Sequence, residues 1–259
     1  MQTITMASFK GGTGKTTVAL HIASALALFH DKRCLLIDSD PQANLTQALG
    51  FSPDSLKALP KALKREIPIY EVIQKTNVEN LKIVCSNTFL DGIEATTELL
   101  GDPYSHERLS TGLSKIKKDF DYCIIDIPPS LNWLCRSAFY AADFSLIAAV
   151  PEPFSMLAMQ RLSEYQQSVN ERHKIDVLGI VLSMWNERSV MNDGSVIGIE
   201  GAFPEKILKT KVRRDNSVAK AVFDGLPVFL TDKNSRASED FKSITQEILN
   251  ILEREPVNA

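Results

Sequence analysis

The chain has 259 residues, of which 44% are hydrophobic and 24% charged, an ordinary composition for a globular protein. Its formal net charge of −3 excludes a globally basic nucleic-acid binder, so any contact with DNA must come from a local patch. The four cysteines form no C-x-x-C pair, and we interpret them as core residues in a reducing cytoplasm. No apolar run is long enough to span a bilayer and no signal peptide is expected, so the sequence predicts a cytoplasmic protein.

Apolar runs and helical patterns alternate along the chain. Strands are predicted at residues 3–7, 34–37, 81–85, 122–125, 144–150 and 177–182. Helices are predicted at residues 16–29, 106–118, 156–170, 216–223 and 238–253, with a polar stretch after residue 182. Strands that are apolar on both faces and alternate with helices indicate a parallel sheet covered on both sides. We therefore expect an α/β fold, a mostly parallel, doubly wound sheet with helices on both faces, in a single domain over residues 1–259.

A glycine-rich loop lies between the first predicted strand and the first predicted helix. Residues 8–17 read Ser-Phe-Lys-Gly-Gly-Thr-Gly-Lys-Thr-Thr. Glycines allow main-chain N–H groups to surround a phosphate, and the following helix points its positive end at the same anion. Lys15 would reach the β- and γ-phosphates of a nucleotide, and the Thr16 hydroxyl would bind Mg²⁺. The predicted nucleotide site consists of Lys10, Gly11, Gly12, Thr13, Gly14, Lys15, Thr16 and Thr17.

Acidic residues follow two of the predicted strands. Asp38 and Asp40 lie two residues apart after the second strand, so both side chains are expected on the same side of the strand, at its carboxyl end. Asp126 follows the apolar residues 122–125 and begins the segment Asp-Ile-Pro-Pro-Ser. This arrangement delivers an acid to the same edge of the sheet, where ligands of such sheets bind.

These motifs, in this order, resemble those of the ParA/MinD superfamily of P-loop ATPases with a deviant Walker A motif. The loop has Phe9 where the strict pattern has glycine, and it carries the early lysine, Lys10, typical of that superfamily. The resemblance extends over essentially the whole chain and is closest to short ParA/Soj-type partition ATPases, because the chain starts at its first strand without an N-terminal helix-turn-helix domain. It implies an Mg²⁺-dependent ATPase with low intrinsic turnover, because no arginine finger is recognisable.

The resemblance also implies roles for single residues. Lys10 would cross the interface of an ATP-sandwiched homodimer, and Asp40 would activate the attacking water. Thr16, Asp38 and Asp126 would form the Mg²⁺ environment. Asn186 matches the position of an adenine contact.

A local basic patch lies near the end of the chain. Between residues 205 and 220 there are six Lys or Arg (206, 209, 211, 213, 214 and 220) against two acids (205 and 215). Such a patch suits sequence-independent contacts with DNA phosphates. The residues expected to contact duplex DNA are Arg188, Lys209, Lys211, Arg213, Arg214 and Lys220. The implied role is plasmid or chromosome partition with a ParB-like partner, nucleoid-associated when ATP is bound.

Four other functions compete with partition. A MinD-like positioning ATPase needs a basic amphipathic tail for the membrane, whereas residues 253–259 are acidic and polar, so no membrane partner is expected. A nitrogenase-reductase-like protein needs paired cysteines, for which Cys123 and Cys135 lack the setting. A switch that never hydrolyses ATP is disfavoured by Asp40 and Asp126. A small-molecule kinase or ligase on the same fold stays open.

Overall fold

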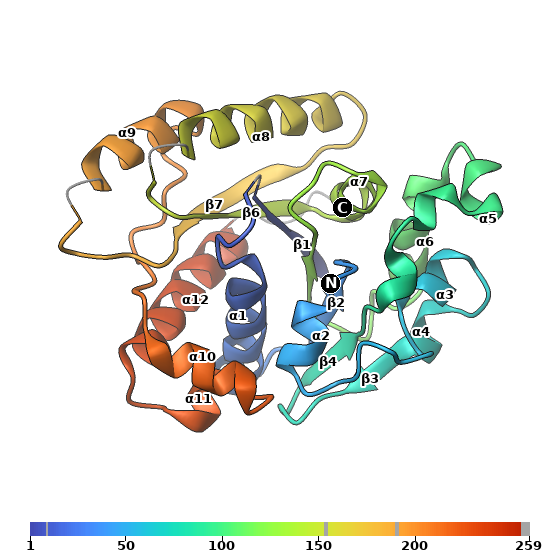
Figure 1. Ribbon diagram of the computed structural model, residues 1–259, viewed down its shortest axis with the longest axis horizontal. Coiled ribbons are helices and arrows are strands. Elements are labelled where there is room, and N and C mark those ends of the chain that lie inside the picture. Colours follow the sequence, from blue (N-terminus) through green and yellow to red (C-terminus); the bar gives the residue numbers. More distant parts are fainter. Residues whose placement is uncertain (9, 153–154, 190–191, 255–259) are drawn as a thin grey trace.

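The fold is built around one sheet (Figure 1). The computed structural model describes residues 1–8, 10–152, 155–189 and 192–254. The sheet has seven strands in the order β3-β4-β2-β5-β1-β6-β7. They are β1 (Gln2–Ala7), β2 (Cys34–Asp38), β3 (Ile73–Lys75), β4 (Leu81–Val84), β5 (Tyr122–Asp126), β6 (Phe144–Ala149) and β7 (Asp176–Leu182). All neighbours are parallel except β3 and β4, at one edge. This confirms the predicted α/β class.

Helices cover both faces of the sheet (Figure 1). One face packs against α1 (Lys15–His30), α2 (Asn44–Ala48), α10 (Asn216–Phe223), α11 (Val228–Thr231) and α12 (Arg236–Arg254). The other packs against α3 (Leu59–Leu63), α4 (Ile69–Val72), α5 (Thr97–Leu100), α6 (Arg108–Ser114), α7 (Trp133–Ala141), α8 (Ser155–Asn170) and α9 (Asn192–Ala202). Within the described residues, no helix is long and apolar enough to cross a membrane.

The strand order brings the predicted site residues together. β1 lies between β5 and β6, and β2 lies on the other side of β5, so the ends of β1, β2 and β5 are close. Asp38 and Asp126 are direct neighbours in the β2–β5 register, and the Ser39 N–H donates to the Asp126 carbonyl at 2.8 Å. Because the carboxyl ends of parallel strands meet at one edge, the acids face the loop that follows β1.

The predicted secondary structure differs from the observed one in several places, and α7 and the short helices α2, α4, α5 and α11 were not predicted. The helix predicted at 106–118 is a 3-10 turn, Ser105–Glu107, followed by α6, which ends at Ser114. It ends there because the next two N–H groups bond to carbonyls three residues back, which tightens the chain into turns. The polar stretch after residue 182 contains α9, and β3 was not predicted because a three-residue edge strand has almost no periodic signal.

Candidate functional site

The loop between β1 and α1 takes its shape from glycines. Gly12 and Gly14 have φ angles of 77° and 79°, in the left-handed region that residues with side chains rarely adopt. Gly14 is the N-cap of α1 and has no side chain to cap the first turn. The N–H groups of that turn, together with the positive end of the helix dipole, are therefore suited to an anion.

Three hydroxyl groups fix this loop. Ser8 Oγ accepts hydrogen bonds from the Lys10 N–H at 3.2 Å and from Thr13 Oγ1 at 2.8 Å, and donates to the Lys10 carbonyl at 3.0 Å. Ser183, which follows β7, donates its Oγ to the Thr13 carbonyl at 2.6 Å. A Cβ added to Gly14 would lie 3.6 Å from the Ser183 Oγ. The loop is thus held from both sides, which lowers the cost of ordering it around a ligand.

Lys15 and Asp126 form a buried pair of charges at the base of the loop. Lys15 is only 7% exposed, and burial lowers its pKa, while Asp126 and Asp40 oppose this shift. Asp126 is fully buried, and burial raises its pKa to about 6, against the Thr16 hydrogen bond and the charge of Lys15. Thr16 Oγ1 donates to Asp126 Oδ2 at 2.6 Å. The predicted loop lysine, hydroxyl and acid therefore meet in one place.

The same place suits Mg²⁺. Asp126 Oδ1 is buried and has no hydrogen-bond partner among the described residues. A carboxylate oxygen beside a hydroxyl is a hard oxygen donor set, and Mg²⁺ typically uses one or two such groups with water and phosphate oxygens. No group of three or more His, Cys, Asp or Glu could hold a metal in the part of the chain that the structure describes. The residues thus fit an ion that arrives with a nucleotide.

The two acids after β2 have different surroundings. Asp40 is 8% exposed, and its Oδ1 accepts a hydrogen bond from the Gln42 N–H at 2.9 Å. Asp38 is fully buried, and its oxygens accept hydrogen bonds from Thr46 and from the Asp40 N–H. Burial and the neighbouring Asp126 raise the pKa of Asp38 to about 7. The metal role of Asp38 stays a prediction, because Oδ1 accepts from the Asp40 N–H and Oδ2 accepts from Thr46 of α2.

Lys10 lies at the exposed rim of the phosphate loop. Its ammonium forms an ion pair with Glu152, in the segment after β6, and both side chains are nearly half exposed. The Lys10 side chain therefore remains accessible, in contrast to the buried Lys15 and Asp126. Glu152 was not singled out from the sequence, since a single acid in a loop carries no spacing signal.

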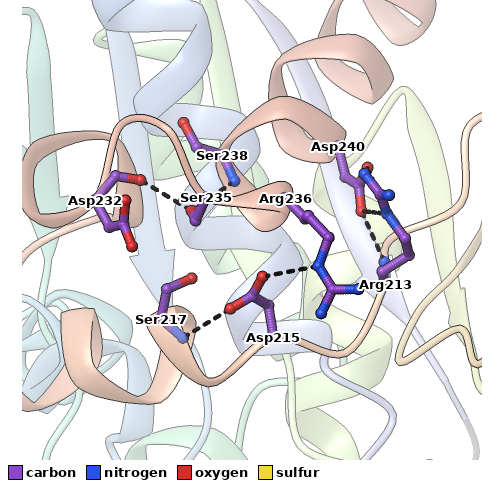
Figure 2. A network of polar contacts seen from close by, with 8 residues as sticks. All are labelled: Arg213, Asp215, Ser217, Asp232, Ser235, Arg236, Ser238 and Asp240. Carbon is purple, nitrogen blue, oxygen red and sulfur yellow. Dashed lines mark hydrogen bonds and ion pairs between the residues drawn. The ribbon is translucent and has the colours of Figure 1, made fainter.

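The predicted DNA contacts fall into two groups. Arg188, Lys209, Arg214 and Lys220 are exposed, and we call these four the basic surface. Arg213 instead holds Asp240 of α12 (Figure 2): its Nη2 lies 2.7 Å from Oδ1 and its Nε 2.9 Å from Oδ2. Its main-chain N–H also donates to Asp240, at 2.9 Å. Arg213 thus fastens this segment to α12, and its side chain is occupied.

Two other predicted residues lie next to this surface. Lys211 Nζ lies 3.9 Å from the centre of the Trp185 ring, an arrangement in which the ring face attracts the cation. Asn186 Oδ1 accepts a hydrogen bond from the Arg188 N–H at 3.1 Å and is exposed. A role in adenine binding stays a prediction for Asn186.

Figure 2 also explains how the segment is anchored next to Arg213. Asp215 accepts a hydrogen bond from the Ser217 N–H at 3.0 Å and so caps α10. Its other oxygen lies 3.6 Å from Nε of Arg236, at the start of α12. Asp215 thus ties the starts of two helices together, which the sequence pattern did not reveal.

The comparisons with known proteins agree with these motifs. The chain matches the AAA domain family over residues 1–178. It is 45% identical over 252 residues to a ParA family protein of Chlamydia muridarum, an alignment that covers 97% of this chain and 99% of the relative. The chain belongs to the ParA family.

Two further likenesses concern function and fold. The chromosome partitioning protein ParA of Myxococcus xanthus is 31% identical over 251 residues, covering 95% of this ParA-family chain and 87% of that protein. The cobyrinic acid a,c-diamide synthase of Mycobacterium smegmatis, solved with bound ADP and magnesium, has a TM-score of 0.85 at 22% identity. That alignment covers 99% of this chain and 97% of the other, and it shows a shared fold.

Proposed function

We propose that this ParA-family protein is an ATP-dependent DNA-partition switch that supports plasmid or chromosome segregation. Its ATP-bound form is a sandwich homodimer that binds duplex DNA without sequence preference, and slow hydrolysis stimulated by a ParB-like partner resets it. The observation that carries the proposal is that the buried Lys15 and Asp126 lie with the Thr16 hydroxyl at the base of a glycine-shaped loop. The partition role is supported by the likeness to a chromosome partitioning protein.

Each residue of the site has a part in ATP binding or hydrolysis. The loop N–H groups and Lys15 would neutralise the β- and γ-phosphates, whose charge grows at the leaving oxygen during hydrolysis. Asp40 would hold the attacking water in line with the bond that breaks. Thr16 and Asp126 would hold Mg²⁺, which neutralises phosphate charge when bound. Lys10 would reach the phosphates bound by the partner subunit.

The basic surface supports the DNA part of the proposal. Four exposed cations on a protein of net charge −3 give one subunit a weak attraction for DNA. A dimer brings two such surfaces to one duplex, and the second engagement becomes intramolecular. DNA binding should therefore depend on the nucleotide that drives dimerisation.

The test is fluorescence anisotropy with unrelated DNA duplexes, without nucleotide, with ADP, and with ATP and Mg²⁺, at several salt concentrations. We expect binding only with ATP, equal for all duplexes. Each phosphate contact should contribute ~0.9 to the slope of log affinity against log salt. Lys15→Ala should lose both ATP binding and DNA binding, because the loop lacks its main cation.

Two charge-matched variants locate the surface. Lys209→Ala with Arg214→Ala should weaken DNA binding and flatten the salt slope. Lys117→Ala with Lys118→Ala removes the same charge at exposed positions before the amino end of the central strand β5, whereas Arg188 follows the carboxyl end of the edge strand β7. This second double variant should leave binding unchanged. DNA binding that is indifferent to nucleotide, or equal in both double variants, contradicts the proposal. A small-molecule kinase or ligase would then be the better reading.

A further inference from the structure

A closed ring of hydrogen bonds surrounds the start of the loop that carries Asp40. Asp38 Oδ2 accepts from Thr46 Oγ1 at 2.7 Å and from the Thr46 N–H at 2.8 Å. Thr46 Oγ1 in turn accepts from the Ser86 N–H at 2.9 Å. Ser86 Oγ donates to the Asp40 carbonyl at 2.5 Å, and the Asp40 N–H donates to Asp38 Oδ1 at 3.1 Å, which closes the ring. We call these four residues the Asp38 ring.

The Asp38 ring joins three separate parts of the chain. Asp38 ends β2, Thr46 lies in α2, and Ser86 follows β4. Asp38, Thr46 and Ser86 are fully buried, where an unbonded carboxylate or hydroxyl would be costly. Each of these buried polar groups has hydrogen-bond partners within the ring, and losing one would leave a buried group unsatisfied, so the ring is a firm support.

The segment between Asp40 and the start of α2 has a constrained backbone. Ala43 has a φ angle of 52°, in the left-handed region that alanine rarely adopts, and its N–H bonds to the Asp40 carbonyl at 2.9 Å. Such a conformation persists only where its surroundings hold it. The Asp40 carbonyl, held by both Ser86 and Ala43, is therefore fixed from two directions.

We propose that Thr46 and Ser86 are positioning residues that hold Asp40 in the correct position relative to the bound nucleotide. The inference rests on the proposed function, because it takes Asp40 as the group that orients the attacking water. Their hydrogen bonds go to the ring, so they act on Asp40 and not on the phosphates. In-line attack tolerates little misplacement, and a shift of about 1 Å can cost ~100-fold in rate.

Hydroxyl-removing variants separate positioning from simple stability. Thr46→Val keeps the side-chain shape but removes both hydroxyl bonds, Ser86→Ala removes one, and Thr46→Ser keeps the hydroxyl. Thr245→Val is the matched control, because Thr245 is also fully buried and donates its hydroxyl to the Phe241 carbonyl at 2.7 Å, within α12. For each, the affinity for a fluorescent ATP analogue with Mg²⁺ and the single-turnover rate of ATP hydrolysis would be measured.

We expect Thr46→Val to slow hydrolysis at least ~10-fold while the dissociation constant stays within ~3-fold, as for an interaction that matters only in the transition state. Ser86→Ala should slow hydrolysis less, Thr46→Ser should restore the rate, and Thr245→Val should match the wild type. A Thr46→Val rate equal to that of Thr245→Val overturns the proposal, as does an equal loss of affinity and rate. If Thr46→Val does not fold, a wild-type rate in Ser86→Ala overturns it.

Asp40→Ala separates this inference from the proposed function. If Asp40→Ala hydrolyses ATP normally, the assumed role of Asp40 is wrong and the proposed mechanism fails with it. If Asp40→Ala is slow while Thr46→Val is normal, only the positioning role fails. When both are slow, the double variant should be no slower than Asp40→Ala, because Thr46 then has nothing left to position.

Discussion

At the scale of single residues, Lys10 and Lys15 carry the same charge but have opposite environments. Lys15 is buried beside Asp126, whereas Lys10 is exposed and ion-paired with Glu152. An exposed ion pair contributes little to stability, so Lys10 can exchange Glu152 for a phosphate at small cost. Under the proposed function, Lys15 would contact the phosphates of its own subunit and Lys10 those of the partner subunit.

Lys10→Ala should therefore keep nucleotide binding by the monomer and lose the ATP-dependent dimer. Glu152→Gln is the comparison, since it frees Lys10 without removing its charge and should leave the dimer intact. Nucleotide titration and light scattering with ATP and Mg²⁺ measure the two properties. A Lys10→Ala protein that still dimerises with ATP would show that Lys10 has no role across the interface.

At the scale of elements, α1 and α12 are joined by a buried histidine. His21 in α1 stacks on Phe241 of α12, with ring centroids 4.3 Å apart. Its Nδ1 lies 2.7 Å from the Thr17 carbonyl, and its Nε2 accepts from the Val228 N–H at 3.1 Å. These partners require a neutral ring with its proton on Nδ1, and burial lowers the pKa of His21 to about 4.

This contact should make stability fall in mild acid. The unfolded chain takes up a proton at His21 with an ordinary pKa of about 6.5, whereas the folded chain does so only near 4, so stability is lost as pH falls through this range. Between pH 7.5 and 5.5 the His21 contribution is about 1 kcal/mol. Asp38 and Asp126, whose pKa values are raised, act in the opposite direction over the same range, so the test is the difference between two proteins. Urea unfolding should show that the change in unfolding free energy from pH 7.5 to 5.5 is more favourable in His21→Gln than in the wild type by that amount. His30→Gln should show a smaller difference of the same sign, because burial also lowers the pKa of this more exposed ring. Equal changes in His21→Gln and the wild type would rule out the His21 contribution.

The segment before α10 gives a second prediction at this scale. Arg213 is bonded to Asp240, whereas its neighbour Arg214 is exposed. Arg213→Ala leaves a buried carboxylate without its main partner and should lower the free energy of unfolding by about 1–3 kcal/mol. Arg214→Ala should leave stability unchanged and weaken only DNA binding. Thermal unfolding and anisotropy of the two variants check this, and the reverse pattern would contradict it.

At the scale of the whole molecule, hydrolysis should determine how long the dimer lasts. If Asp40 orients the attacking water, Asp40→Ala should bind ATP and dimerise but rarely hydrolyse the ATP, so that the dimer rarely dissociates. Light scattering over time with ATP and Mg²⁺ should show a persistent doubling of mass in the variant and a transient one in the wild type. A variant dimer that decays at the wild-type rate would assign Asp40 another role.

The sequence predicted six of the seven strands, the phosphate loop and its lysine because these depend on local patterns of apolar residues and glycines. It did not predict Ser183, Ser86 or Glu152, because each is a single polar residue whose importance comes from a contact far along the chain. Arg213 and Arg214 show the same limit. They are adjacent and chemically alike, and only the position of Asp240 on α12 distinguishes a structural cation from an exposed one.

The central place of β1 also affects how the chain is made. β1 leaves the ribosome well before its neighbours β5 and β6, which begin only at Tyr122 and Phe144. Until β5 and β6 are synthesised, the apolar strand β1 has no neighbouring strand to pair with, and nascent chains in such a state are prone to aggregate. Ser183, which holds the loop through Thr13, emerges later still. The newly made protein therefore acquires its nucleotide site only after β5, β6 and Ser183 have been synthesised, although the phosphate loop itself is translated before all of them.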